Sequence, residues 1–194
     1  YTTFQQKLKS VEESKGTVTV KVEVTNTGAV AGKDVVEVYY TPPYYNGGIE
    51  KAAVNLIDFG KTHLLEPGAS QELTLTFQME DMASFDENGK GCYVLEQGDY
   101  EISLRSDSHT VIDSQTIHQD ADIVYDAENP RSTDKTAAVT AFDFAKGNVT
   151  YLSRKDHFAN FEAAAAAPTS YSMPDEVKAD FWSLANYDAA DDEK

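Results

Sequence analysis

One acidic stretch has oxygen ligands at a spacing that could bind calcium. DENGKG, at residues 86–91, begins like the loop of an EF hand, which needs an oxygen ligand at its fifth position and a glutamate at its twelfth. Here those positions hold Lys90 and Gln97, which cannot complete the ligand set. We therefore predict a hairpin turn at this stretch rather than a calcium site.

A second acidic stretch could also contribute metal ligands. If the chain is extended there, His118, Asp120 and Asp122 lie on one face. A metal site usually draws further ligands from elsewhere, and none is indicated. A solvated acidic linker is the favoured interpretation, and we predict no metal site and no cofactor.

A tyrosine-rich stretch is the strongest candidate for a contact site. Tyr39 and Tyr40 close a strand-like run, and Tyr44 and Tyr45 follow two prolines in a predicted loop. Aromatic side chains carry large apolar faces, so this loop could bind the apolar face of a sugar ring. It could equally dock a neighbouring domain, which is the interpretation that we favour. Direct sugar contact and incidental exposure stay open.

The sequence shows no signal of a catalytic centre. Glycoside hydrolysis needs two carboxylates at a defined separation, but 33 acidic residues would supply such a pair by chance. None of the four histidines belongs to a recognisable nucleophile motif. The glycosylation sequon Asn148-Val149-Thr150 matters only in a secretory pathway, which the single cysteine, Cys92, does not favour. We predict no catalytic residue in this chain.

Composition narrows the class of protein further. A length of 194 residues suits one domain with an extension, and a net charge of -17 argues against nucleic acid as a partner. No apolar run is long enough to span a membrane, and the first residues contain no apolar signal core. From these features we expect a cytoplasmic location and no membrane partner.

The first part of the chain has the pattern of half-buried strands. Apolar residues alternate with polar ones in TVTVKVEVT, QELTLTF and DYEISLR, and glycine- and proline-rich turns separate these runs. Apart from Glu37, DVVEVYY is apolar on both faces, which is typical of a central strand. We predict an all-β fold for residues 1–117, an antiparallel β-sandwich of about seven strands.

The pattern changes at about residue 118. Residues 118–194 show no sustained period, so we predict an extended linker with one or two short helices, DHFANFEAAAAAP and MPDEVKADFWSLANY. This segment cannot bury its aromatic side chains in itself, so we expect it to lie against the sandwich or against a further domain. These side chains are Phe142, Phe144, Tyr151, Phe158, Phe161 and Trp182.

Several motifs together resemble one protein family. VEVTNTGAVAGKDVVEVYYTPP, at residues 22–43, is similar to the strand pair of the fibronectin type III-like domain of family 3 glycoside hydrolases, the β-glucosidase family. Further motifs of that domain follow in the same order. They are NLIDFGKT, LEPG, MASFD and QGDYE, and the opening YTTF also resembles the start of this domain.

Two positions depart from the pattern of the family. The segment Arg105-Ser106-Asp107-Ser108 stands where a Gly-Ser-Ser-like stretch is usual, and Tyr93 stands where tryptophan is common. These departures concern local packing. The resemblance still implies an immunoglobulin- or fibronectin III-like sandwich.

The resemblance also implies a role. In this family the catalytic carboxylates lie on a barrel and on an α/β domain, and neither is recognisable in these 194 residues. The resemblance therefore implies that this chain alone is inactive and that its partners are the catalytic domains of the same polypeptide, with β-glucosides at the site entrance. Residues 147–168 resemble the connecting segment of bacterial members in which the sandwich precedes the barrel.

Two functions therefore stand at this point. The first is a non-catalytic accessory domain that holds catalytic domains of a β-glucosidase in register. The alternative is a carbohydrate-binding module that contacts glycans through Tyr44 and Tyr45. An adhesion or surface-display role is disfavoured, because the sequence shows no anchor.

Overall fold

A computed structural model describes residues 1–134, 136, 147, 149–167, 172–173 and 175–184 of the chain. The chain forms two compact units, Tyr1–Ala138 and Val139–Lys194, and each is described by itself. Among the described residues, no helix combines the length and the apolar character needed to cross a membrane.

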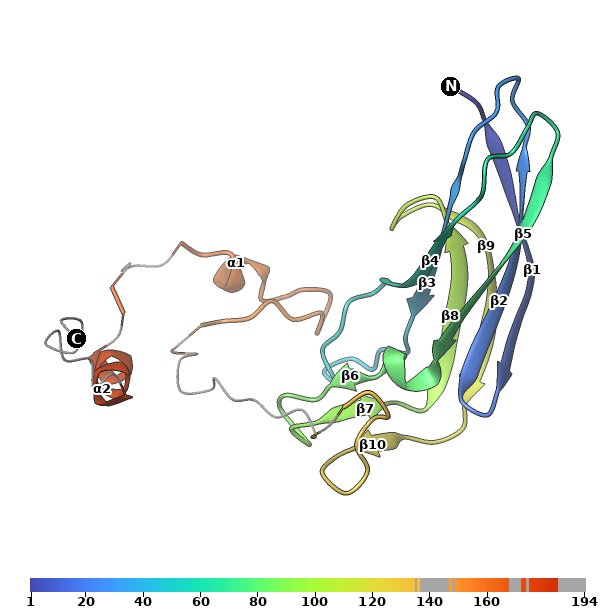
Figure 1. Cartoon of the computed structure of the whole chain (residues 1–194). Helices are drawn as coiled ribbons and strands as arrows, with labels where there is room; N and C mark the ends of the chain where they lie inside the picture. Colours follow the sequence, from blue (N-terminus) through green and yellow to red (C-terminus); the bar gives the residue numbers. More distant parts are fainter. Residues whose placement is uncertain (135, 137–146, 148, 168–171, 174, 185–194) are drawn as a thin grey trace, which may run out of the picture. The chain divides into compact units, whose positions relative to one another are not determined.

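The first unit is an antiparallel β-sandwich, as the sequence predicts (Figure 1). One sheet has three strands in the order β1-β2-β5, and the facing sheet has four in the order β4-β3-β8-β9. The three-stranded sheet consists of β1 (Phe4–Ser14), β2 (Thr17–Asn26) and β5 (Ser70–Gln78). The four-stranded sheet consists of β3 (Val35–Thr41), β4 (Asn55–Lys61), β8 (Gly98–Arg105) and β9 (Val111–Gln119).

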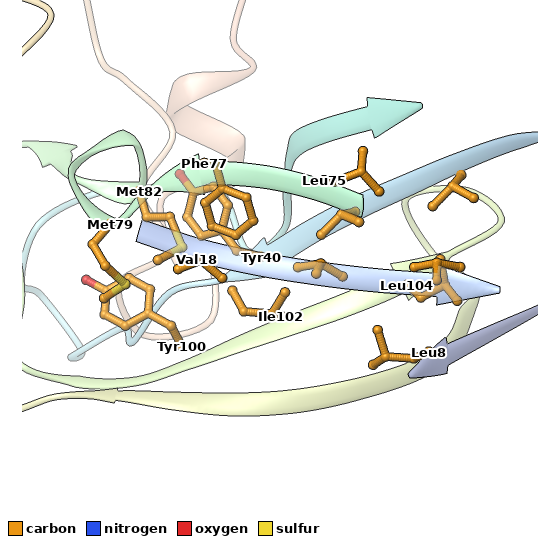
Figure 2. Close-up of a cluster of buried hydrophobic side chains, with 14 of the residues drawn as sticks. Leu8, Val18, Tyr40, Leu75, Phe77, Met79, Met82, Tyr100, Ile102 and Leu104 are labelled. Atoms are coloured by element: carbon orange, nitrogen blue, oxygen red, sulfur yellow. The ribbon is translucent and has the colours of Figure 1, made fainter. Parts of the chain in front are cut away.

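Alternation along the strands builds the core. In β2, Val18, Val20, Val22 and Val24 are completely buried, while the residues between them are partly exposed. Full burial of a valine side chain contributes about 1.5–3 kcal/mol, so this strand anchors the sandwich. Figure 2 shows the facing side chains, among them Ile102, and these close the core from the four-stranded sheet.

The predicted central strand is central in the structure. β3 pairs with β4 on one side and with β8 on the other, and Val36, Val38 and Tyr40 are buried. Strand β3 needs apolar residues on its inner face because that face covers the core. Its outer face carries Glu37 and Tyr39, whose hydroxyl donates to the Glu37 carboxylate at 2.7 Å.

A small third sheet lies beyond the sandwich strands. It has the order β10-β7-β6, formed by β6 (Ser84–Phe85), β7 (Tyr93–Leu95) and β10 (Ile123–Tyr125), and a 3₁₀ helix, η1 (Met79–Met82), precedes it. The predicted hairpin turn is confirmed here. The Asp86 amide donates to the carbonyl of Cys92 at 2.9 Å, and the Gly91 amide returns to Asp86 at 2.8 Å.

The segment after residue 117 begins with residues that pair with strands of the first unit. β9 continues to Gln119, and β10 pairs with β7. Farther along, the Arg131 guanidinium lies 3.7 Å from the centre of the Tyr93 ring, and the Ser132 amide donates to the Glu80 carboxylate at 3.0 Å. A strand of three residues is too short to show a period, and its pairing partner is remote in sequence. The boundary between residues 117 and 118 as a domain limit stays a prediction.

The second unit contains two short helices, as predicted: α1 (Phe161–Ala164) and α2 (Asp175–Leu184). α1 is shorter than the sequence suggests, because Asp156, His157 and Phe158 have positive φ angles and cannot join a right-handed helix. Tyr151, Phe158 and Phe161 are exposed in this unit. The other predicted features of this segment lie outside the described residues. They are Phe142, Phe144, Asn148, Pro168, Pro174 and the side chain of Trp182.

Candidate functional site

The candidate tyrosines lie in the loop that joins β3 to β4, here called the aromatic loop (residues 42–54). The loop begins where β3 ends, because Pro42 and Pro43 have no amide hydrogen to continue the ladder. A tight turn follows, in which the Gly48 amide donates to the Tyr45 carbonyl at 2.7 Å. The sequence therefore predicts the place of the loop correctly.

The two candidate tyrosines have different environments. Tyr45 is 54% exposed, yet its hydroxyl donates to the carbonyl of Gln97 at 2.7 Å. Tyr44 is half-buried, and its hydroxyl lies 3.5 Å from a carboxylate oxygen of Glu50 within the same loop. Only Tyr45 combines an exposed ring with a fixed hydroxyl, so it is the better candidate for contact with another molecule.

Gly98, the first residue of β8, lets the aromatic loop approach the backbone of that strand closely. Gly98 has a φ of +136°, which L side chains rarely adopt. A Cβ at this position would lie 2.9 Å from the Pro43 Cβ and 3.0 Å from the Tyr45 hydroxyl oxygen. The aromatic loop can therefore rest on this backbone only because the residue is glycine.

An ion pair fastens the other end of the loop. Lys51 pairs with Glu96, and their side chains are 5% and 13% exposed. The Tyr100 hydroxyl donates to the Glu96 carbonyl at 3.0 Å, and the Gln97 amide donates to Asp122 at 2.7 Å. The aromatic loop and residues 96–98 thus form one fastened unit, and nothing in the local sequence around Lys51 indicates this.

Two buried tyrosines lie in the strands behind the loop, Tyr40 in β3 and Tyr100 in β8. Burial is the main cause that raises the pKa of Tyr100, and the neighbouring Tyr40 adds to the shift. Burial also raises the pKa of Tyr40 itself. The exposed ring of Tyr45 is thus the part of this region that is available for contact with an apolar surface.

The predicted ligand run does not gather around a common point. The His118 Nδ1 lies 2.5 Å from Asp99, across the β8–β9 pair, and 3.9 Å separates the other ring nitrogen from Asp120. Asp122 instead accepts the Gln97 amide. In the part of the chain that the structure describes, no three His, Cys, Asp or Glu side chains form a group that could hold a metal ion.

A cleft of about 430 Å³ lies beside the small sheet, where Lys15, Met79, Glu80, His118 and Tyr125 contribute to its walls. Two of its polar side chains, Glu80 and His118, are already engaged. Both carboxylate oxygens of Glu80 accept the Ser132 amide, and His118 is held by Asp99. We therefore regard the cleft as a weaker candidate than the aromatic loop.

Comparison with known proteins agrees with the fold. Residues 34–108, from the start of β3 to the turn after β8, match the family model of the fibronectin type III-like domain. Beta-glucosidase A of Butyrivibrio fibrisolvens is 41% identical over 99 residues, which are 50% of this chain and 12% of the relative.

Solved structures give the same result. Beta-glucosidase 3B from Thermotoga neapolitana is 36% identical with a TM-score of 0.58, and the match covers 64% of this chain and 17% of that one. A beta-glucosidase from Paenibacillus barengoltzii is also 36% identical, with a TM-score of 0.55 over 64% of this chain and 15% of that one. The matched part thus spans less than a fifth of each of these relatives.

Proposed function

We propose that the sandwich is the fibronectin type III-like domain of a family 3 β-glucosidase. In this role it is a non-catalytic accessory domain that packs against the catalytic domains of the enzyme and positions them. The observation that carries this proposal is the match of residues 34–108, together with the small share that the matched part takes of each relative. A domain that makes up less than a fifth of a polypeptide works together with the other domains of that polypeptide.

The closed core and the fastened loop of the sandwich support a positioning role. Its core is closed by two sheets, and the aromatic loop is fastened by the Lys51–Glu96 pair and the Tyr45–Gln97 hydrogen bond. Rigid elements hold neighbouring groups in place more precisely than mobile ones. An exposed aromatic ring on such a frame is a suitable contact for a second domain, since aromatic residues are enriched in protein interfaces.

The coding sequence on both sides of this stretch provides the first test. It should encode a barrel and an α/β domain in the same reading frame. The second test is enzymatic: the 194-residue chain should not hydrolyse an aryl β-glucoside, whereas the longer polypeptide should. Turnover by the chain alone that persists through extensive purification would contradict the proposal.

A deletion tests the positioning role directly. Removal of residues 1–138, the whole first unit, from the longer polypeptide should lower its thermal stability and its kcat/KM, since unsupported catalytic domains lose their alignment. A polypeptide that keeps both values without these residues would show that the sandwich does not position the catalytic domains.

One observation favours a second function, binding of glycans by the aromatic loop. Tyr45 presents its ring to solvent while its hydroxyl is fixed, which reduces the entropy lost on binding. Calorimetry with cello-oligosaccharides tests this function. Binding that is lost in Tyr45→Ala but kept in Tyr151→Ala, an equally exposed tyrosine of the second unit, would support it. The absence of any heat of binding would exclude it.

A further inference from the structure

The two outer faces of the sandwich differ in composition. On the three-stranded sheet, the residues that alternate with the core positions are polar on every strand. Directly paired residues of antiparallel strands lie on the same face, so the register identifies this set. It comprises Gln5, Lys7, Ser10, Glu12, Thr19, Lys21, Glu23, Thr25, Ser70, Glu72, Thr74 and Thr76. This is the usual composition of a sheet face in contact with water.

The outer face of the four-stranded sheet is different. In one row across the sheet, Phe59 of β4 pairs with Glu37, Glu37 with Arg105, and Arg105 with Val111 of β9. Phe59 is 66% exposed and Val111 is 46% exposed. The adjacent rows add Val35 and Leu56, which are also exposed. These four residues, Val35, Leu56, Phe59 and Val111, define what we call the apolar outer face.

The middle of this face is already ordered. The Arg105 guanidinium lies 5.9 Å from the centre of the Tyr39 ring and donates from Nε to the Ser103 hydroxyl at 2.7 Å. Its Nη1 also donates to the Ser108 carbonyl at 3.1 Å. Arg105, Tyr39 and Ser103 are buried although they lie outside the core. A partner would thus meet a preformed surface whose middle is held in place by Arg105 and Tyr39.

The charge of this face also differs from that of the chain. The rows that hold the apolar residues contain two bases, Lys61 and Arg105, and one acid, Glu37. Glu101 in the next row pairs with Arg105 at 3.4 Å, so the formal charge of this face is zero. The chain as a whole carries -17. An acidic partner would therefore be repelled less by this face than by the average surface of the chain. Two copies of the chain would bring two strongly negative bodies together, which opposes self-association.

We propose that the apolar outer face is the surface through which the sandwich docks against an adjoining domain of the same polypeptide. This inference rests on the proposed function and names the surface that performs it. The expected partner is another domain of the same polypeptide. In the relatives the matched part is 12–17% of the length, so most of each polypeptide lies outside the sandwich. Apolar surface of this kind is normally buried when the partner is present.

Single reporter cysteines test the proposal. The natural Cys92 is 5% exposed, so it contributes little background reaction with a maleimide. Phe59→Cys and Val111→Cys report on the apolar outer face, Thr74→Cys on the opposite face, and Tyr45→Cys on the aromatic loop. Labelling rates are compared between the 194-residue chain and the longer polypeptide. Thermal unfolding of each variant confirms that it is folded, and amide hydrogen exchange of β4 and β5 in the unmodified proteins gives a measurement free of substitutions.

The expected result is that positions 59 and 111 react quickly in the isolated chain and at least about tenfold more slowly in the longer polypeptide, while position 74 is unchanged. Protection of position 74 or 45 without positions 59 and 111 would overturn this inference and leave the proposed function intact. Protection at no position would overturn both. Protection of positions 59 and 111 in the isolated chain that grows with its concentration would identify a second copy as the occupant and overturn the inference.

Discussion

Replacement of Lys51 by methionine should lower the free energy of unfolding of the sandwich, because it removes the cation that pairs with Glu96. The two side chains are 5% and 13% exposed, so water cannot take the place of the lost partner. Methionine keeps the approximate volume of lysine but leaves the Glu96 carboxylate in a nearly dry environment. A buried charge without a partner is strongly destabilising, whereas a well-packed apolar pair can be neutral.

The expected magnitude follows from the burial of the pair. Removal of one partner from a buried ion pair costs about 3–5 kcal/mol. Because Glu96 keeps a little contact with water, we expect the lower end, a loss of about 3 kcal/mol in the free energy of unfolding. For a chain of this size each kcal/mol lowers Tm by about 3 °C, so Tm should fall by about 10 °C.

Urea and thermal unfolding of the 194-residue chain, followed by tyrosine fluorescence and circular dichroism, measure this loss. Lys9→Met is the matched control, since Lys9 lies 3.7 Å from Glu23 with both side chains well exposed, and should change stability by less than about 1 kcal/mol. The double variant Lys51→Met with Glu96→Leu should recover most of the loss. If Lys51→Met costs no more than Lys9→Met, the pair does not fasten the aromatic loop and the reasoning is wrong.

Three further changes test the same region. Tyr45→Phe removes the hydrogen bond to Gln97 and should cost about 1 kcal/mol in urea unfolding; an unchanged midpoint would mean that the bond contributes nothing. Gly98→Ala forces a Cβ against Pro43 at a positive φ and should cost about 2–3 kcal/mol, whereas unchanged stability would contradict the close approach. Alkaline pH should also destabilise the fold. Because burial raises the pKa of Tyr100 in the folded state, its stabilisation is complete below about pH 10 and is lost above it, by up to about 1.4 kcal/mol per pH unit. A flat stability profile from pH 9 to 11 would refute this.

The sandwich could be predicted from the sequence because its signal is local. The alternation of Val18 to Val24 is visible in one short stretch, and each of these residues is buried as the period requires. The same holds for β8, where Tyr100, Ile102 and Leu104 face the core. The position of the aromatic loop was also predictable, since two prolines end the strand before Tyr44 and Tyr45.

What holds the loop was not predictable, because its partners are remote in sequence. Lys51 and Glu96 are 45 residues apart, and Tyr45 and Gln97 are 52 apart. An isolated lysine among 25% charged residues gives no sign that it is buried. In the second unit, a composition rich in alanine predicted a longer helix than α1. The left-handed residues 156–158 lie in a segment that the Asn160 side-chain amide closes by donating to the Tyr151 carbonyl, a contact that helix propensity does not encode.

The two positions at which the sequence departs from the fibronectin type III-like pattern, at Arg105 and at Tyr93, are both ordered by contacts within this chain. Arg105 donates to the carbonyl of Ser108, and Asp107 accepts the amides of His109 and Thr110, so this turn is held by its own side chains. Those hydrogen bonds, led by the one from His109, lower the pKa of Asp107. Tyr93 is likewise covered by Arg131, whose guanidinium Asp134 binds through two hydrogen bonds. Arg105 and Tyr93 are therefore both fixed by hydrogen bonds or ring contacts, and Arg105 also orders the centre of the apolar outer face.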